Sequence, residues 1–300
     1  MNHAIRVRDL TKRFGSMTAV DRCSLAVEAG SVYALIGSNG AGKSTLIRML
    51  LNIVEPTSGE ADVLGLNCRT LSGDGFRRIA YVAEDQEQPD WMTVRQLLDY
   101  CQPFYPDWDP ALAAELVKQF ALPLDRKLKH LSRGMRMKAV LVSSLAYRPK
   151  LIVLDEPFGG LDPLVRDEFV ESLIDRAPET TILISSHDLA EIETFATHIG
   201  FMEDGRLAFS EELSTLAARM REVELTFSAP PTLPSPWPSG WLNPQLSGVV
   251  LRFVETAYEP ARSHSAIAER FGGVNNLDFR AIPLRAMFLA IARAARDRQA

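Results

Sequence analysis

The sequence has few cysteines, no long apolar run and no excess of positive charge. Its three cysteines, Cys23, Cys68 and Cys101, are far apart and odd in number, so they predict reduced thiols and exclude a disulfide framework or a zinc site. The longest apolar run, at residues 287–292, is shorter than the ~18 residues that a membrane-spanning helix requires. The first residues, MNHAIRVRDL, hold no apolar stretch typical of a signal peptide, so we expect none.

The formal net charge of the chain is −5. This charge argues against a nucleic-acid-binding surface as the main function, although it leaves room for a local basic patch. We therefore expect no nucleic-acid partner. The 300 residues, of which 46% are hydrophobic, suffice for one large domain, or for one large and one small domain.

A glycine-rich motif, GSNGAGKS, occupies residues 37–44 and fits the pattern G-x-x-x-x-G-K-[ST] at every fixed position. The apolar residues 32–36 predict a buried strand before it, and residues 45–51 predict a helix after it. Such a turn points backbone N–H groups at phosphates, Lys43 neutralises the β- and γ-phosphates, and the Ser44 hydroxyl suits Mg²⁺. A chance glycine-rich loop is the alternative, and the flanking strand and helix argue against it. The predicted nucleotide-binding residues here are Gly37, Ser38, Asn39, Gly40, Ala41, Gly42, Lys43, Ser44 and Thr45.

Three more motifs, LSRGM, LIVLDEP and GGLD, lie between Leu131 and Asp162. The apolar strand predicted at residues 151–154 delivers Asp155 and Glu156 side by side at its C-terminal tip. One carboxylate suits a metal-bound nucleotide and the other suits activation of a water molecule. The alternative, a solvated strand end, fits poorly with the fully apolar strand that precedes the pair.

The remaining pattern alternates strands with helices, which predicts an α/β domain with a largely parallel sheet. Thr93, Asp109-Pro110 and Ser132 are typical helix starts, so residues 85–146 predict a helical region. The other predicted elements are short strands within residues 4–36, a β region at 52–75, strands at 79–82 and 180–185, helices at 163–175 and 188–196, and a hairpin at 199–209.

The character of the chain changes after about residue 220. We expect a strand at residues 223–227, an irregular proline-rich segment at 230–244, and then a strand, a helix, a strand and a helix up to residue 296. The predicted domains are thus 1–219, with a helical subdomain at about 85–146, and a small α+β domain at 220–300.

These motifs, together with Ser186-His187-Asp188, occur in one order along residues 4–215. In this combination the chain resembles the ATP-binding subunit of ABC transporters, above all the exporter-type subunits that carry no membrane segment of their own. The resemblance implies a P-loop NTPase ABC-type ATP-binding domain, built from a β subdomain, a parallel-sheet core and a helical subdomain, to which the small α+β appendage is added.

The resemblance also implies roles for the polar residues. Asp155 would hold Mg²⁺ together with Ser44, and Glu156 would be the general base for the attacking water. His187 would contact the γ-phosphate and steer Glu156. Asp162 would communicate across a pair of subunits, and its alternative role, as the cap of the following helix, is compatible with that.

Phe14 matches the position at which the family stacks an aromatic ring on adenine, and a core phenylalanine in a β-turn is the alternative. Glu84 stands where the family usually has glutamine, with Gln86 and Gln88 close by. A glutamate there still offers an oxygen to nucleotide-bound Mg²⁺, but it adds negative charge near the triphosphate.

The LSRGM motif departs further from the family's LSGGQ. Ser132 and Gly134 are kept for the phosphate, whereas Arg133 replaces glycine and Met135 replaces glutamine. Arg133 would either face the partner's nucleotide or point to solvent, and we favour solvent.

The resemblance implies an ATPase that uses ATP and Mg²⁺, pairs with a second copy or a homologous subunit, and drives a separate multi-span permease, with export as the expected direction. It would lie in the cytoplasm on the inner face of the membrane. The alternative is a soluble ABC ATPase of translation or DNA repair, but this chain has one cassette, no coiled-coil insertion and no CxxC. A catalytically dead binding module is opposed by the intact Lys43, Asp155, Glu156 and His187.

Overall fold

The computed structural model describes residues 3–84, 86–175 and 180–297. It consists of two compact units, Met1–Ser210 and Glu211–Ala300. The domain limits expected from the sequence, 1–219 and 220–300 with a helical subdomain at about 85–146, stay predictions. Within the described ranges, none of the helices combines the length and the apolar character needed to cross a bilayer.

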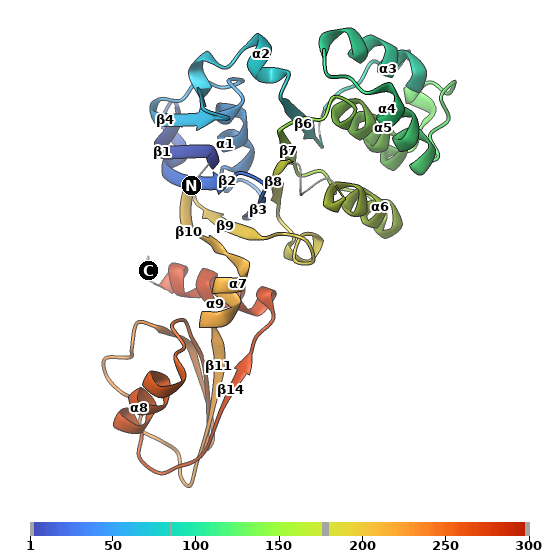
Figure 1. Ribbon diagram of the computed structural model, residues 1–300. Helices are drawn as coiled ribbons and strands as arrows, with labels where there is room; N and C mark the ends of the chain where they lie inside the picture. The colour runs from blue at the N-terminus through green and yellow to red at the C-terminus, as the bar shows by residue number, and fades with distance from the viewer. Residues whose placement is uncertain (1–2, 85, 176–179, 298–300) are drawn as a thin grey trace. The chain divides into compact units, whose positions relative to one another are not determined.

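A six-stranded sheet forms the centre of unit 1, in the order β10-β9-β3-β8-β7-β6 (Figure 1). The strands from β9 to β6 pair in parallel. Three of them, β3, β7 and β8, are buried along their whole length, which explains their continuous apolar sequences. The bounds are β3 (Val32–Ile36), β6 (Ile79–Ala83), β7 (Leu151–Asp155), β8 (Thr181–Ser186), β9 (His198–Glu203) and β10 (Arg206–Glu212). The predicted α/β fold is confirmed.

The register of this sheet aligns the ends of its strands. Leu35 of β3 pairs with Ser185 of β8, and Ser185 pairs with Asp155 of β7. Asp155 in turn pairs with Ala83 of β6. The residues that follow these four positions therefore lie along one edge of the sheet.

A second sheet, antiparallel in the order β2-β1-β4-β5, shares an apolar core with the helix after β3. Leu46 and Ile47 of that helix are buried against side chains such as Ile5, Val27 and Leu183. The strands expected at residues 4–36 are present, two of them as long strands of 12 residues. The bounds are β1 (His3–Phe14), β2 (Met17–Glu28), α1 (Lys43–Leu50), β4 (Ser58–Val63) and β5 (Leu66–Asn67).

Helices α3, α4 and α5 gather beside the β6 edge of the central sheet, as Figure 1 shows. Each predicted helix start caps its helix. Thr93 and Gln96 form a capping box, and Asp109 accepts hydrogen bonds from the backbone of Ala111 and Leu112. The bounds are α2 (Gly73–Phe76), α3 (Val94–Cys101), α4 (Pro110–Gln119), α5 (Arg133–Leu145) and α6 (Pro163–Ile174).

The helix expected at residues 188–196 is wrong. Only a 3-10 turn, Leu189–Glu191, forms there. Ser186 donates a hydrogen bond to Glu191, and the N–H of Thr197 donates to Val32 of the central sheet. The segment is thus held by contacts with strand ends, which the local sequence pattern does not contain.

Unit 2 is a four-stranded antiparallel sheet, ordered β12-β13-β11-β14, with an aromatic core. Trp241, Phe253 and Phe271 lie in that core. Strand β12 begins inside the segment expected to be irregular, so that expectation is wrong in part. Its proline, Pro244, falls at a register shift of an edge strand, where a missing N–H is tolerated. The bounds are α7 (Leu213–Arg219), β11 (Arg221–Phe227), β12 (Trp241–Ser247), β13 (Val250–Glu255), α8 (Pro260–Arg270), β14 (Val274–Ala281) and α9 (Leu284–Asp297).

Candidate active site

The loop of residues 37–44 joins β3 to α1 and can be closed only by glycine at two places. A Cβ at Gly37 would lie 2.3 Å from the carbonyl oxygen of Met202. Gly42 has φ of 102°, and its Cβ would lie 2.4 Å from the carbonyl oxygen of Ala19. The loop therefore ends on the N-terminus of α1, whose first N–H groups have no partner inside the helix and suit an anion. The middle of the loop, Ser38 to Gly40, is exposed, whereas Ala41 is buried.

Lys43 is buried, and its ammonium group is fully paired within the chain. Its Nζ donates to the carbonyl oxygens of Gly37, at 2.6 Å, and Ser38, at 3.1 Å. The same nitrogen lies 3.0 Å from Oε1 of Glu156. A lysine so placed holds a full positive charge at the mouth of the loop, where phosphate groups would replace the carboxylate as its partner.

Asp155 ends β7 and points to the start of α1. Its Oδ1 accepts hydrogen bonds from the hydroxyls of Ser44, at 2.9 Å, and Ser185, at 2.7 Å. Burial raises the pKa of Asp155, and the two hydroxyls oppose that shift. A buried carboxylate beside a hydroxyl is a fitting donor set for Mg²⁺, which prefers oxygen ligands and also favours the ionised form. The next residue of α1, Thr45, is half-buried.

Glu156 follows directly and has a left-handed backbone with φ of 51°, which is uncommon for a residue with a side chain. Its N–H donates to the Ser185 hydroxyl. Its two carboxylate oxygens have different partners, because Oε1 faces Lys43 and Oε2 lies 2.7 Å from Nδ1 of His187. Glu156, the predicted base, thus links two other predicted site residues. Lys43, the predicted phosphate-binding lysine, contacts one of its oxygens, and His187, the predicted switch histidine, contacts the other.

Glu156 and His187 shift each other's pKa. Burial works to raise the pKa of Glu156, but the hydrogen bonds and positive charges of His187 and Lys43 outweigh it, so the pKa lies below its ordinary value. The hydrogen bond to Glu156 raises the pKa of His187, against a smaller opposite effect of burial. The pair is therefore an ionised carboxylate held against a readily protonated imidazole.

The predicted partner-facing residues lie at two helix starts. Ser132 caps α5 by accepting a hydrogen bond from the N–H of Met135, and Asp162 caps α6 through Val165. Gly134 is buried, and a Cβ there would lie 3.0 Å from the side chain of Val165. Both helix starts thus meet at Val165. The capping role expected for Asp162 is present, and its role between subunits stays a prediction.

Two further predicted site residues, Glu84 and Phe14, have other contacts. The carboxylate of Glu84 is turned to the guanidinium of Arg133, so a role as metal ligand stays a prediction. The interpretation of Arg133 as a solvent-facing side chain missed this ion pair, because nothing in the sequence links residues 49 positions apart. Phe14 is 46% exposed at the end of β1, with Nζ of Lys12 at 4.9 Å from its ring centre, so it is not the core phenylalanine of the alternative interpretation.

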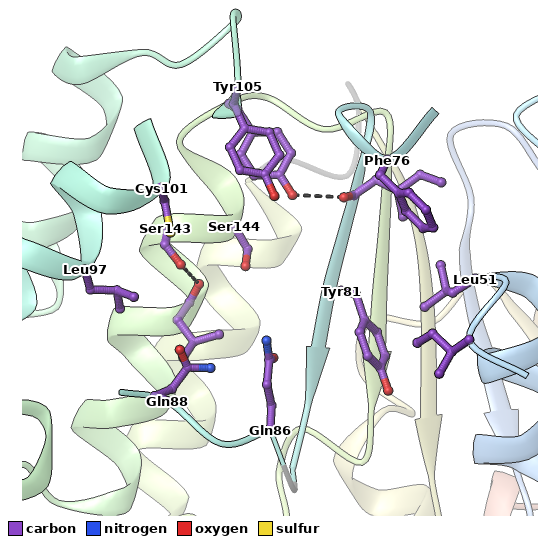
Figure 2. Close-up of a pocket in the computed structure, with 14 residues that line it drawn as sticks. Leu51, Phe76, Tyr81, Gln86, Gln88, Leu97, Cys101, Tyr105, Ser143 and Ser144 are labelled. Carbon is purple, nitrogen blue, oxygen red and sulfur yellow. Dashed lines mark hydrogen bonds between the residues drawn. The ribbon is translucent and has the colours of Figure 1, made fainter. Parts of the chain in front are cut away.

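A cleft of about 360 Å³ was not expected from the sequence. Figure 2 shows Leu51, Phe76 and Tyr81 on one side, across from Leu97 and Cys101 of α3. Its lining side chains are apolar, aromatic, amide or hydroxyl groups, without a charge. Ile53 and Phe76 line the cleft, and they are 56% and 38% exposed. Large apolar residues in and next to a segment rich in turn residues are the signal in the sequence that could have indicated this cleft.

Comparisons with known proteins agree with this geometry. A family model described as "ABC transporter" matches residues 20–159. The ABC transporter ATP-binding protein YtrB of Bacillus subtilis (strain 168) is 32% identical over 225 residues, 74% of this chain and 77% of the relative. The bacitracin transport ATP-binding protein BcrA of Bacillus licheniformis is 33% identical over 226 residues, 74% of each chain. A solved structure of an ATP-binding subunit of an ABC transporter has a TM-score of 0.66 and 27% identity, covering 72% of this chain and 92% of that chain.

The His187–Glu156 pair predicts a titration that NMR can follow. The pKa of His187 should lie above its ordinary value of 6.5 and should fall when Glu156→Gln removes the carboxylate's charge. Because the folded pKa of His187 is raised, the pair's stabilising effect is complete below pH 6.5 and is lost as the pH rises through that raised value. Because the folded pKa of Glu156 is lowered from 4.5, the effect is lost again as the pH falls through that lowered value.

The measurement is a pH titration of the histidine ring signals in both proteins. A His187 pKa that is the same in both proteins contradicts the pairing.

Proposed function

This chain belongs to the family of ABC transporter ATP-binding proteins, and on that premise we propose that two copies of it close around two Mg²⁺–ATP molecules and thereby drive a separate membrane permease. ATP hydrolysis that powers transport is the activity of the family. The observation that carries the proposal is the position of the Glu156 carboxylate, which lies within hydrogen-bonding distance of Lys43 through Oε1 and of His187 through Oε2.

The residues of the loop suit the triphosphate. The N–H groups at the start of α1 would bind phosphate oxygens, and Gly37 and Gly42 let the loop pack closely against the backbone of Met202 and Ala19. Ser44 and Asp155 would hold the cation, whereas the carboxylate of Glu84 is paired with Arg133. Mg²⁺, when bound, would neutralise charge that develops in the transition state.

Lys43 has to exchange partners when nucleotide binds. Its Nζ turns from Glu156 to the β- and γ-phosphates, which leaves Oε1 of Glu156 free for a water molecule. His187 keeps Oε2 of the same carboxylate in place. Glu156 then accepts a proton from the water as its oxygen attacks the γ-phosphorus, and the ADP oxygen leaves in line. Glu156 is thus paired with Lys43 when nucleotide is absent, and it is free to act as a base when nucleotide is bound.

The helix start at Ser132 and Gly134 supports a second half-site. Ser132 is exposed at the N-terminus of α5, where a phosphate is favoured. Among the described residues, no recorded contact joins Ser132 or Gly134 to the chain's own phosphate-binding loop. We assign this turn, with Asp162, to the nucleotide held by the partner copy.

The permease is the second partner. The uncharged cleft of Figure 2 offers a binding site for a short helical or looped segment of the permease. Attachment there would hold the chain at the inner face of the membrane. The names of the relatives favour transport over a translation or repair role. Export follows from the resemblance to exporter-type subunits, and the choice of substrate belongs to the permease.

Replacement of the base tests the chemistry. Glu156→Gln should leave ATP binding intact and slow hydrolysis by at least about 100-fold, because a general base contributes ~10²–10⁴-fold to the rate. With turnover blocked, MgATP should also stabilise a dimer that size-exclusion chromatography with light scattering detects. Glu193→Gln, at an exposed position, is the matched control. Hydrolysis at the parent rate in Glu156→Gln contradicts the assignment.

Removal of the ring tests the adenine site. Phe14→Ala should weaken ATP affinity about tenfold, because one stacked base is worth ~1–3 kcal/mol and 1.4 kcal/mol is a factor of ten. Isothermal titration in the Glu156→Gln background measures binding without hydrolysis. Phe104→Ala removes a ring that is 55% exposed elsewhere and should leave the affinity unchanged. Equal affinities of the Phe14→Ala chain and its parent exclude stacking.

A further inference from the structure

Two of the three residues that depart from the family's motifs, Glu84 and Arg133, are charged and meet in the folded chain. Glu84 follows β6, and Arg133 opens α5. Their side chains form an ion pair, with 40% of Glu84 and 50% of Arg133 exposed. Each departure alone introduces a charge where the family's motif has none, and together the two charges cancel.

Two consecutive glycines, Gly159 and Gly160, lie directly against this ion pair. A Cβ at Gly159 would lie 2.3 Å from Oε1 of Glu84, and a Cβ at Gly160 would lie 2.6 Å from Nη1 of Arg133. Both glycines belong to the loop that leads from Glu156 to Asp162. The pair therefore lies directly against the segment that joins the base to the helix cap, and side chains there would displace it.

The charges around the pair explain why Glu84 needs a partner. The N–H of Glu84 donates to the carbonyl oxygen of Asp155 at 3.0 Å, so Glu84 lies beside β7 at the level of the catalytic carboxylates. Of these acids, Glu156 faces Lys43, whereas Asp155 accepts hydrogen bonds from two hydroxyl groups and suits the cation. An unneutralised Glu84 would repel the phosphates of the nucleotide through this crowded, partly buried edge.

We propose that Arg133 is a positioning residue that acts through Glu84: it neutralises the Glu84 carboxylate and holds it on the Gly159-Gly160 loop, so that the site binds the triphosphate despite the extra acid. This role rests on the proposed function. It predicts an effect on nucleotide affinity and not on stability, because exposed ion pairs contribute little to folding. It also predicts that Arg133 becomes dispensable once Glu84 is an uncharged amide.

The test is a double-mutant cycle on MgATP affinity, measured by isothermal titration in the Glu156→Gln background. Arg133→Gln should weaken binding by about 5- to 10-fold, as expected for one uncompensated charge near the phosphates, and the loss should shrink as salt is raised. Glu84→Gln should restore the affinity when added to Arg133→Gln, and Arg133→Lys should keep most of it. Melting temperatures should stay within about 3 °C of the parent.

A control is the pair Arg95–Asp125, which lies in the helical region at 3.2 Å, with an arginine about as exposed as Arg133 and an acid that is more exposed than Glu84. Arg95→Gln and Asp125→Asn should leave MgATP affinity unchanged. An Arg133→Gln loss that persists with Glu84→Gln would overturn the proposal in favour of direct contact with a phosphate, and no loss at all would also overturn it. If the Glu156→Gln parent itself does not bind MgATP, the proposed function fails, which is a separate result.

Discussion

The parallel register of β3, β8, β7 and β6 is the constraint on which the site depends. It sets Leu35, Ser185, Asp155 and Ala83 in one row across four strands. The chain leaves each strand at nearly the same level, so the loop of residues 37–44, Glu156, His187 and Glu84 emerge together. A slip of one residue in any strand would move its functional side chains to the other face of the sheet.

That row brings several carboxylates close together, so each of them needs a hydrogen-bond donor or a positively charged partner. Asp155, Glu156 and Glu84 end or follow neighbouring strands, and each has partners drawn from another segment. Lys43 comes from α1 and Arg133 from α5. A nucleotide with its cation brings phosphates and positive charge to the same edge, so its binding has to exchange these partners. In this view the salt bridge from Lys43 to Glu156 couples nucleotide binding to the release of the base.

Much of the fold could be predicted because its signals are local. Buried strands are continuous apolar runs, and Thr93, Asp109 and Ser132 cap their helices as their sequences indicate. The errors arose where tertiary contacts override local pattern, as in the 3-10 turn at Leu189–Glu191 and the edge strand that tolerates Pro244. Site residues could be named from motifs, and the resemblance already linked Ser44 with Asp155 and His187 with Glu156. The contact between Glu84 and Arg133 could not be predicted, because only the fold brings these two residues together.

The division of the active site between two copies is the central claim, and complementation in trans tests it most directly. A Lys43→Ala chain keeps its Ser132 turn, and a Ser132→Arg chain keeps its phosphate loop. ATPase activity is measured for each alone and for an equal mixture. Each alone should be inactive, and the mixture should regain about a quarter of the parent rate, since random pairing gives half mixed dimers with one complete site each. A mixture as inactive as its components, or a fully active Ser132→Arg chain, would contradict the account.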